Sequence, residues 1–241
     1  GISGDMTLSA FVSAGLSLDE LANEIQKLHL DGVQLIGKHI SRSGITAVKI
    51  DVLIPEEHHH RHLRDIFQII EMSELSENVK DTAKKIFYQL GIAEATVHNT
   101  SIEKIHFHEV GALDAIVDIV GVAICLEKFG IEQCYSSPVK LGSGGFVNAA
   151  HGRLPIPVPA VVEILKNYPT ELTEIPFDLT TPTGAAIIKT LSNGMLPHTQ
   201  IQMQKIGYGA GGREIPQMPN LLRIVIGELP VLRAVSSFPI S

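Results

Sequence analysis

A run of histidines in the first half of the chain is the segment whose side chains most directly suggest metal chemistry. Residues 56–62 place four imidazoles within five consecutive positions. The four are His58, His59, His60 and His62. Imidazole nitrogen is a ligand suited to nickel, copper and zinc. The run lies between an expected strand ending near Pro55 and an expected helix beginning near Leu63, so it should form an exposed loop. Such a loop either binds metal loosely, as delivery requires, or is only a solvated polar segment.

Carboxylates and imidazoles are combined in a second group, within residues 105–118. Asp114 and Asp118 are four residues apart, which places both on one face of a helix whose other faces are apolar. Two buried carboxylates repel each other, at a cost on the order of several kcal/mol, unless a cation or hydrogen bonds compensate. Further ligands just before the helix are His106, His108 and Glu109. We therefore expect a functional site here; the alternative is that the two aspartates only brace neighbouring backbone.

Three glycine-rich segments in the second half of the chain could bind a phosphate. Backbone N–H groups of a flexible turn or of a helix N-terminus form hydrogen bonds with anions. Thr181 followed by Pro182 is typical of a helix start, and an arginine beside glycines can bind an anion through two hydrogen bonds. The candidate groups are Gly142, Ser143, Gly144, Gly145, Thr181, Thr183, Gly209 and Arg213. None of the segments matches a Walker A loop, and glycine turns are commonly only turns, so that alternative stays open.

The elements that must position these groups follow from the hydrophobic periodicity. Helices are predicted to begin after Ser17, near Leu63, near Val79 and near Ala112. Gly91 suits the C-terminal stop of the third of these helices. The fourth is apolar nearly all round and should be buried. Alternation over residues 33–40 and 45–54 predicts a β-hairpin.

The second half of the chain has a different texture. Residues 142–212 are rich in glycine and proline, which predicts short strands and two short helices after Pro159 and Pro182. The fold class expected from all elements is α+β, a mixed α/β domain with several helices and short, mostly antiparallel strands. We assign residues 1–229 to one region, with a possible sub-boundary near residue 100 or 135, and leave the tail 230–241 unassigned.

Composition bounds the kind of protein. A chain of 241 residues with 44% hydrophobic residues can bury a sizeable core. The net charge of −7 argues against a nucleic-acid surface, which needs a basic face to neutralise phosphates. No apolar run is long enough to span a membrane. Cys125 and Cys134 form neither a disulfide framework nor a metal knuckle, so we expect a reducing, cytoplasmic environment.

Several segments together resemble the LarC family of nickel-insertion proteins. The matching segments are Gly1-Ile2-Ser3-Gly4-Asp5-Met6, the histidine run before Leu63, residues 108–118, Thr181-Pro182-Thr183-Gly184-Ala185-Ala186 and Gly207-Tyr208-Gly209-Ala210-Gly211. They recur in the family's order from Gly1 to about Leu229, and the block that begins at His108 is the most specific.

The resemblance implies an enzyme, a nickel chelatase of the lyase class. Such a protein inserts Ni²⁺ into pyridinium-3,5-bisthiocarboxylic acid mononucleotide, the precursor of the nickel-pincer cofactor of lactate racemase. It implies that CTP is split with the help of Mn²⁺ or Mg²⁺. Expected partners are the family's carboxy-terminal CTP-binding domain, lactate racemase apoprotein and further copies in a homo-oligomer. The resemblance also implies that the chain needs that domain for full activity.

On this reading the residues divide into three sets. Nickel capture is expected from the imidazoles of the histidine run, and the glycine-rich segments would hold the nucleotide. The inner, catalytic site is expected at His108, Glu109, Asp114 and Asp118, with Asp5 as a further candidate. Two rival functions remain. A nickel storage or delivery protein would bind metal without depending on the aspartates, and a metal-dependent phosphoesterase would cleave simple phosphate esters without nickel.

Overall fold

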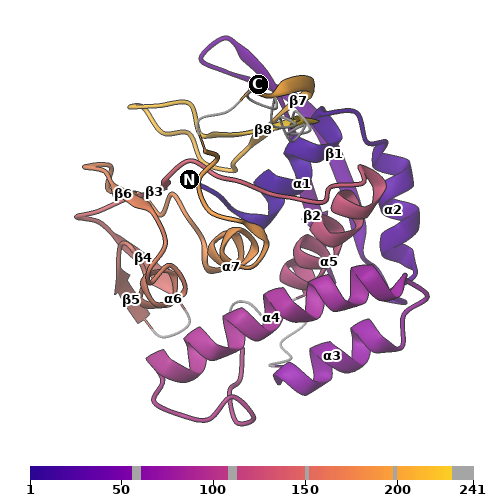
Figure 1. Ribbon diagram of the computed structural model, residues 1–241. Helices are drawn as coiled ribbons and strands as arrows, with labels where there is room; N and C mark the ends of the chain where they lie inside the picture. Colours follow the sequence, from indigo (N-terminus) through magenta and orange to yellow (C-terminus); the bar gives the residue numbers. More distant parts are fainter. Residues whose placement is uncertain (56–60, 108–112, 150–151, 198–199, 230–241) are drawn as a thin grey trace, which may run out of the picture.

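A computed structural model describes residues 1–55, 61–107, 113–149, 152–197 and 200–229 of the chain. Figure 1 shows a four-stranded sheet at the upper right, two helices along the lower edge and two small sheets at the left. The helices are α1 (Gly4–Ser13), α2 (Leu18–Gln26), α3 (Leu63–Glu71), α4 (Glu77–Val97), α5 (Leu113–Lys128), α6 (Pro159–Ile164) and α7 (Pro182–Leu191). The strands are β1 (Gln34–Arg42), β2 (Ile45–Leu53), β3 (Val139–Leu141), β4 (Phe146–Ala149), β5 (Gly152–Pro155), β6 (Thr170–Leu172), β7 (Gln202–Ala210) and β8 (Leu221–Glu228).

The main sheet combines strands from early and late in the described part of the chain. Its strand order is β1-β2-β7-β8, so the hairpin β1–β2 pairs with the last two described strands. The predicted hairpin is confirmed as the antiparallel pair β1–β2, whereas β2 and β7 are parallel and meet at Val48 and Gly209. The remaining pairs are β7–β8 and β4–β5, which are antiparallel, and β3–β6, which is parallel. The α+β class is confirmed.

Helix α1 lies directly on the sheet because glycines leave room for its backbone. A Cβ atom at Gly207 would stand 1.9 Å from the carbonyl oxygen of Ala10, and one at Gly209 would stand 1.9 Å from that of Met6. Backbone contact this close needs residues without side chains. In addition, the hydroxyl of Ser9 accepts a hydrogen bond from the buried N–H of Ile50 at 2.8 Å. Helix and sheet are therefore held by both packing and hydrogen bonding.

Helix α5 runs through the core and confirms the prediction of a buried helix. Its residues from Ala115 to Cys125 are buried, apart from the partly enclosed Asp118. Gly121 allows the crossing with α1, since a Cβ atom there would meet Leu8 Cδ2 at 2.7 Å. A tightly packed core of this kind fixes the direction in which the one polar face of α5 points.

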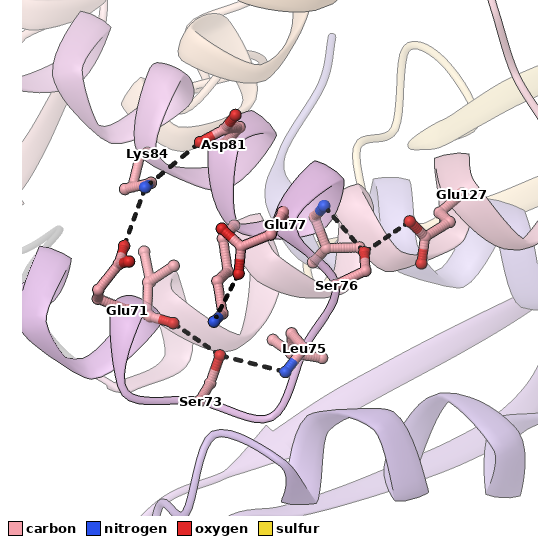
Figure 2. Close-up of polar contacts among 11 residues, drawn as sticks. Glu71, Ser73, Leu75, Ser76, Glu77, Asp81, Lys84 and Glu127 are labelled. Carbon is pink, nitrogen blue, oxygen red and sulfur yellow. Dashed lines mark hydrogen bonds and ion pairs between the residues drawn. The ribbon is translucent and has the colours of Figure 1, made fainter.

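The turn between α3 and α4 is fixed by polar contacts that also reach α5 (Figure 2). Ser76 Oγ accepts a hydrogen bond from Val79 N at 3.2 Å, which caps α4, and donates to Glu127 Oε2 at 2.6 Å. Lys84 Nζ lies 3.0 Å from Glu71 Oε2, which links α4 to the last residue of α3. These contacts hold α3 against α4 and the start of α4 against α5, the helix that carries the aspartates.

The predicted stop at Gly91 is wrong, because α4 continues through it to Val97. A glycine inside a helix costs roughly 1 kcal/mol relative to alanine. Packing explains its presence here: a Cβ atom at Gly91 would lie 3.2 Å from Ile102 and 3.3 Å from Leu63. The other predicted starts hold, with Ser17 accepting from Glu20 N at 3.4 Å before α2, and short helices after Pro159 and Pro182.

Candidate functional site

The start of α1 meets the first turns of α5 around Asp118. A Cβ atom at Gly4 would lie 2.3 Å from Asp118 Oδ2 and 2.6 Å from its Cγ, so the carboxyl group rests against the first residue of α1. The backbone N–H of Asp5 forms a hydrogen bond with this carboxylate. Asp118 thus caps the positive end of α1 from another helix, which is part of its structural role.

One oxygen of Asp118 is left over after this capping. Its Oδ1 atom is enclosed and has no hydrogen-bond partner among the described residues. Burial, followed by the charges of Asp5 and Asp114, raises the pKa of the Asp118 carboxyl well above its usual range. A buried carboxylate oxygen without a partner is unfavourable, because it has lost its water and gained nothing in exchange. The site therefore favours either a proton or a cation at this position.

Two further carboxylates stand close enough to act on Asp118. Asp114 lies one helical turn earlier on α5, and its Oδ1 accepts from the backbone N–H of Ala115 at 2.8 Å. Partial burial and then the charge of Asp5 raise the pKa of the Asp114 carboxyl. Because the Asp114 residue is exposed, water screens it more than the enclosed Asp118. Asp5 itself accepts a hydrogen bond from the hydroxyl of Ser3.

The structure brings two predicted metal-binding histidines together. His62 immediately precedes α3, and its Nδ1 lies 2.9 Å from the carbonyl oxygen of Ile105. The ring of His106 is next to that of His62, with centroids 3.9 Å apart and an angle of 44° between the planes. An antiparallel bridge between Arg61 and Phe107 joins the two segments. The last histidine of the run at residues 56–62 therefore lies beside His106. The sequence alone could not show this contact.

Five other predicted ligands lie outside the described residues. They are His58, His59, His60, His108 and Glu109. Within the described part of the chain, no group of three or more His, Cys, Asp or Glu side chains is arranged to hold a metal ion. The predicted ligands that are described thus lie in two places: the aspartates at the α1–α5 contact and the two histidines beside α3. The metal-binding and catalytic roles of the predicted residues stay predictions.

The glycine-rich segments occupy three different settings. Gly142 packs against backbone, since a Cβ atom there would lie 1.8 Å from Phe177 O, and Ser143 Oγ donates to Thr173 O at 2.6 Å. Gly144, with φ +76°, and Gly145 complete this turn, and Gly145 also adjoins backbone.

Thr181 caps α7 as predicted, accepting from Gly184 N at 3.2 Å, and Thr183 follows in its first turn. Gly209 lies within β7 under α1, a setting that its packing explains, and Arg213 is exposed beyond the strand. Their predicted roles in binding the mononucleotide stay predictions.

The start of α7 adjoins the start of α1. Thr181 N donates to the carbonyl oxygen of Ile2 at 3.1 Å, and a Cβ atom at Gly184 would lie 2.1 Å from the same oxygen. The glycine-rich segment at Thr181 therefore contacts residues 1–3, the segment that precedes Asp5.

The described residues form a mixed α+β domain with a buried, partly unpartnered carboxylate at the α1–α5 contact and a separate imidazole pair beside α3. Comparison with known proteins shows the family: the model of the nickel insertion protein family matches residues 1–237, and the chain belongs to that family. No solved structure shows significant similarity to it. Among the described residues, no helix is long and apolar enough to cross a membrane.

Three curated relatives share the name pyridinium-3,5-bisthiocarboxylic acid mononucleotide nickel insertion protein. The relative from Geobacillus kaustophilus is 45% identical over 238 residues, which cover 95% of this chain and 58% of the relative. That from Desulfitobacterium hafniense strain DSM 10664 / DCB-2 is 47% identical over 229 residues, covering 95% and 56%. That from Staphylococcus epidermidis is 45% identical over 225 residues, covering 93% and 56%. The chain thus spans less than two thirds of each relative.

Proposed function

We propose that this chain takes part in inserting nickel into pyridinium-3,5-bisthiocarboxylic acid mononucleotide, with CTP consumed in the process. Membership of the nickel insertion family and the names of the relatives support the substrate. The observation that carries the assignment of the site is the enclosed Oδ1 of Asp118, which has no partner among the described residues. A carboxylate kept in this state is more readily explained by a cation than by the scaffold alone.

Two different metal ions are proposed to bind at two different kinds of ligand. Carboxylate oxygens are the ligands that Mg²⁺ and Mn²⁺ prefer, so Asp114 and Asp118 would hold the ion that accompanies CTP together with Glu109, which lies outside the described residues. That ion would supply charge neutralisation for the nucleotide phosphates. Imidazoles suit nickel, so the histidines beside α3 and in the preceding run would receive the Ni²⁺ that is the cargo of the reaction. His108 and Glu109 would lie between the two groups in sequence.

The proposed function also involves a CTP-binding domain, a recipient for the product, a cellular compartment and an oligomeric state. The relatives are longer than this chain, and we place the CTP-binding domain in the part that this sequence does not span. The nickel-pincer product would pass to lactate racemase apoprotein, and the nickel chelatase would belong to the lyases. We place the reaction in the cytoplasm because Cys125 and Cys134 are free thiols, and we propose a homo-oligomer as the working form.

The test is reconstitution from purified components. The chain, the remaining part of the family sequence, Ni²⁺, CTP, Mg²⁺ and the mononucleotide are combined, and the nickel-containing product is measured by mass spectrometry. Product that depends on CTP and is lost with Asp118→Asn supports the proposal. Nickel binding without any product would instead favour storage or delivery. Hydrolysis of simple phosphate esters without nickel would favour a phosphoesterase.

A further inference from the structure

We propose that His62 and His106 bind one transition-metal ion between them and form the first docking position for nickel on this chain. This inference deepens the nickel-handling function proposed above and rests on it. It concerns two side chains that are distant in the sequence but whose ring centroids lie 3.9 Å apart. His106 is exposed and His62 is half-buried, so an ion can reach the pair from solvent.

The hydrogen bond of His62 fixes which ring nitrogen is available. A carbonyl oxygen can only accept, so the 2.9 Å contact with Ile105 O requires the proton on Nδ1. In the neutral ring, Nε2 then carries the lone pair that binds a metal. A backbone carbonyl that holds the other nitrogen is the usual way in which proteins orient a metal-binding imidazole. His62 is therefore held in the tautomer that metal binding needs.

The backbone beneath both rings is held in place before any ion arrives. Ile105 and Phe107, on either side of His106, are 3% and 2% exposed, so the intervening side chain is directed outward. Phe107 N donates to Arg61 O at 3.2 Å, and the ring of Phe107 packs edge-on against Phe87 of α4. Binding thus requires little ordering of the chain, which lowers its entropic cost.

The distance between the rings is close to that of a shared ion. With metal–nitrogen bonds of about 2.1 Å and the angle of about 90° found in square-planar or octahedral Ni²⁺ sites, two imidazoles on neighbouring positions of one ion have their centres roughly 4.5 Å apart. The observed 3.9 Å differs from this by less than an ångström, which small ring rotations can supply. Two protein ligands leave the other coordination positions open, as expected of a site that passes its ion on.

The competing explanation is purely structural. His62 ties Ile105 to the start of α3, and its backbone N–H donates to Asp65 Oδ2 at 2.9 Å. His106 would then only stack on it. This explanation accounts for His62 but gives no reason for an imidazole, rather than another flat side chain, at position 106. Substitutions that keep the packing and remove the metal ligand separate the two explanations.

The experiment titrates metal-free protein with NiCl₂ by calorimetry and counts bound imidazoles by electron paramagnetic resonance with Cu²⁺. His62→Asn keeps a donor for Ile105 O and removes Nε2; His106→Phe keeps a flat ring against His62. The control is His39→Ala, an exposed imidazole on β1. Each of the first two changes should weaken the tightest nickel site at least ~10-fold, with two nitrogen couplings reduced to one. The control should leave both readouts unchanged, and melting temperatures should stay close to wild type.

Unchanged nickel affinity in both His62→Asn and His106→Phe would overturn the inference. So would loss of the tight site in a chain with His58, His59 and His60 changed to Ala and His62 and His106 intact. The proposed function is tested separately by the reconstituted insertion reaction. If wild type inserts nickel while both variants bind it normally, only this inference fails. If the variants lose the tight site but wild type inserts nothing, the inference stands and the function fails.

Discussion

Asp118 is a side chain whose surroundings are better suited to a neutral or metal-bound state than to a free charge. One oxygen receives the N–H of Asp5, and the other is enclosed without a partner among the described residues. If a cation normally compensates this group, removing the charge should stabilise the metal-free protein and abolish nickel insertion. If the group serves the scaffold alone, the charge should matter little to insertion.

We expect Asp118→Asn to raise the free energy of unfolding in metal-free buffer at neutral pH by roughly 1 kcal/mol, since the cost of burying the charge and the repulsion from Asp5 and Asp114 are relieved. Nickel insertion in the reconstituted system should fall at least ~100-fold. Thermal unfolding and product formation are measured on the same preparation. Normal insertion with a lowered melting temperature would assign Asp118 to the scaffold.

The raised pKa of Asp118 also predicts how stability depends on pH. In the folded protein this carboxyl keeps its proton above the usual pKa of 3.8, where the unfolded chain has already lost it. Its contribution to stability is therefore fully present below pH 3.8 and is lost as the pH rises toward the raised folded pKa.

Urea unfolding of the metal-free protein from pH 4 upward should show this loss, and Asp118→Asn should remove it. Adding Mg²⁺ should reduce it, because a bound cation favours the ionised form. A wild-type profile that coincides with that of Asp118→Asn across this range would contradict the assignment.

At the scale of elements, the contact between α1 and β7 sets where Asp5 stands. Gly209 leaves no room for a side chain, because a Cβ atom would lie 1.9 Å from Met6 O and 2.7 Å from Ala10 N. Gly209→Ala should therefore displace α1 and destabilise the protein by roughly 3 kcal/mol. Gly212→Ala is the matched control, as its Cβ would meet only Lys49 Cε at 3.9 Å. Chemical denaturation of both variants should separate them clearly; equal stabilities would contradict the packing.

Ser76 fixes the turn between α3 and α4, as Gly209 fixes the contact between α1 and β7. It caps α4 and donates to Glu127 Oε2 of α5 at 2.6 Å, so Ser76→Ala removes two interactions (Figure 2). A loss of about 1 kcal/mol in the free energy of unfolding is expected, the size typical of an N-cap serine. Ser76→Asp, which restores a capping oxygen but repels Glu127, should recover only part of it. Denaturant midpoints measure both, and wild-type stability in Ser76→Ala would show that the cap is dispensable.

At the scale of the whole molecule, this chain spans only 56–58% of the three relatives described above, to which it is 45–47% identical. We expect it to bind Ni²⁺ by itself but to hydrolyse CTP at least ~100-fold more slowly than a reconstituted mixture with the remaining part of the family sequence. The measurement is release of CMP with and without that part. Full CTP-dependent insertion by this chain alone would show that the additional part is unnecessary.

Elements whose residues carry strong local signals were predictable from the order of the amino acids. The Ser17 cap, the β1–β2 hairpin, the apolar α5 and the starts of α6 and α7 all depend on neighbours in the chain. Gly91 was misleading because a glycine that follows a helical pattern is read locally as a stop. In the folded protein the lack of a side chain at Gly91 serves its contact with Ile102, and that at Gly209 serves its contact with α1.

Which chemical groups meet depends on how the elements pack in three dimensions. The spacing of Asp114 and Asp118 put them on one helical face, but the placement of Asp5 beside them depends on α1 crossing α5 at Gly121. Likewise, His62 and His106 meet only because Arg61 and Phe107 pair across a bridge. Periodicity reports which side of an element a residue occupies; which other element it faces depends on packing between segments that are far apart in the sequence.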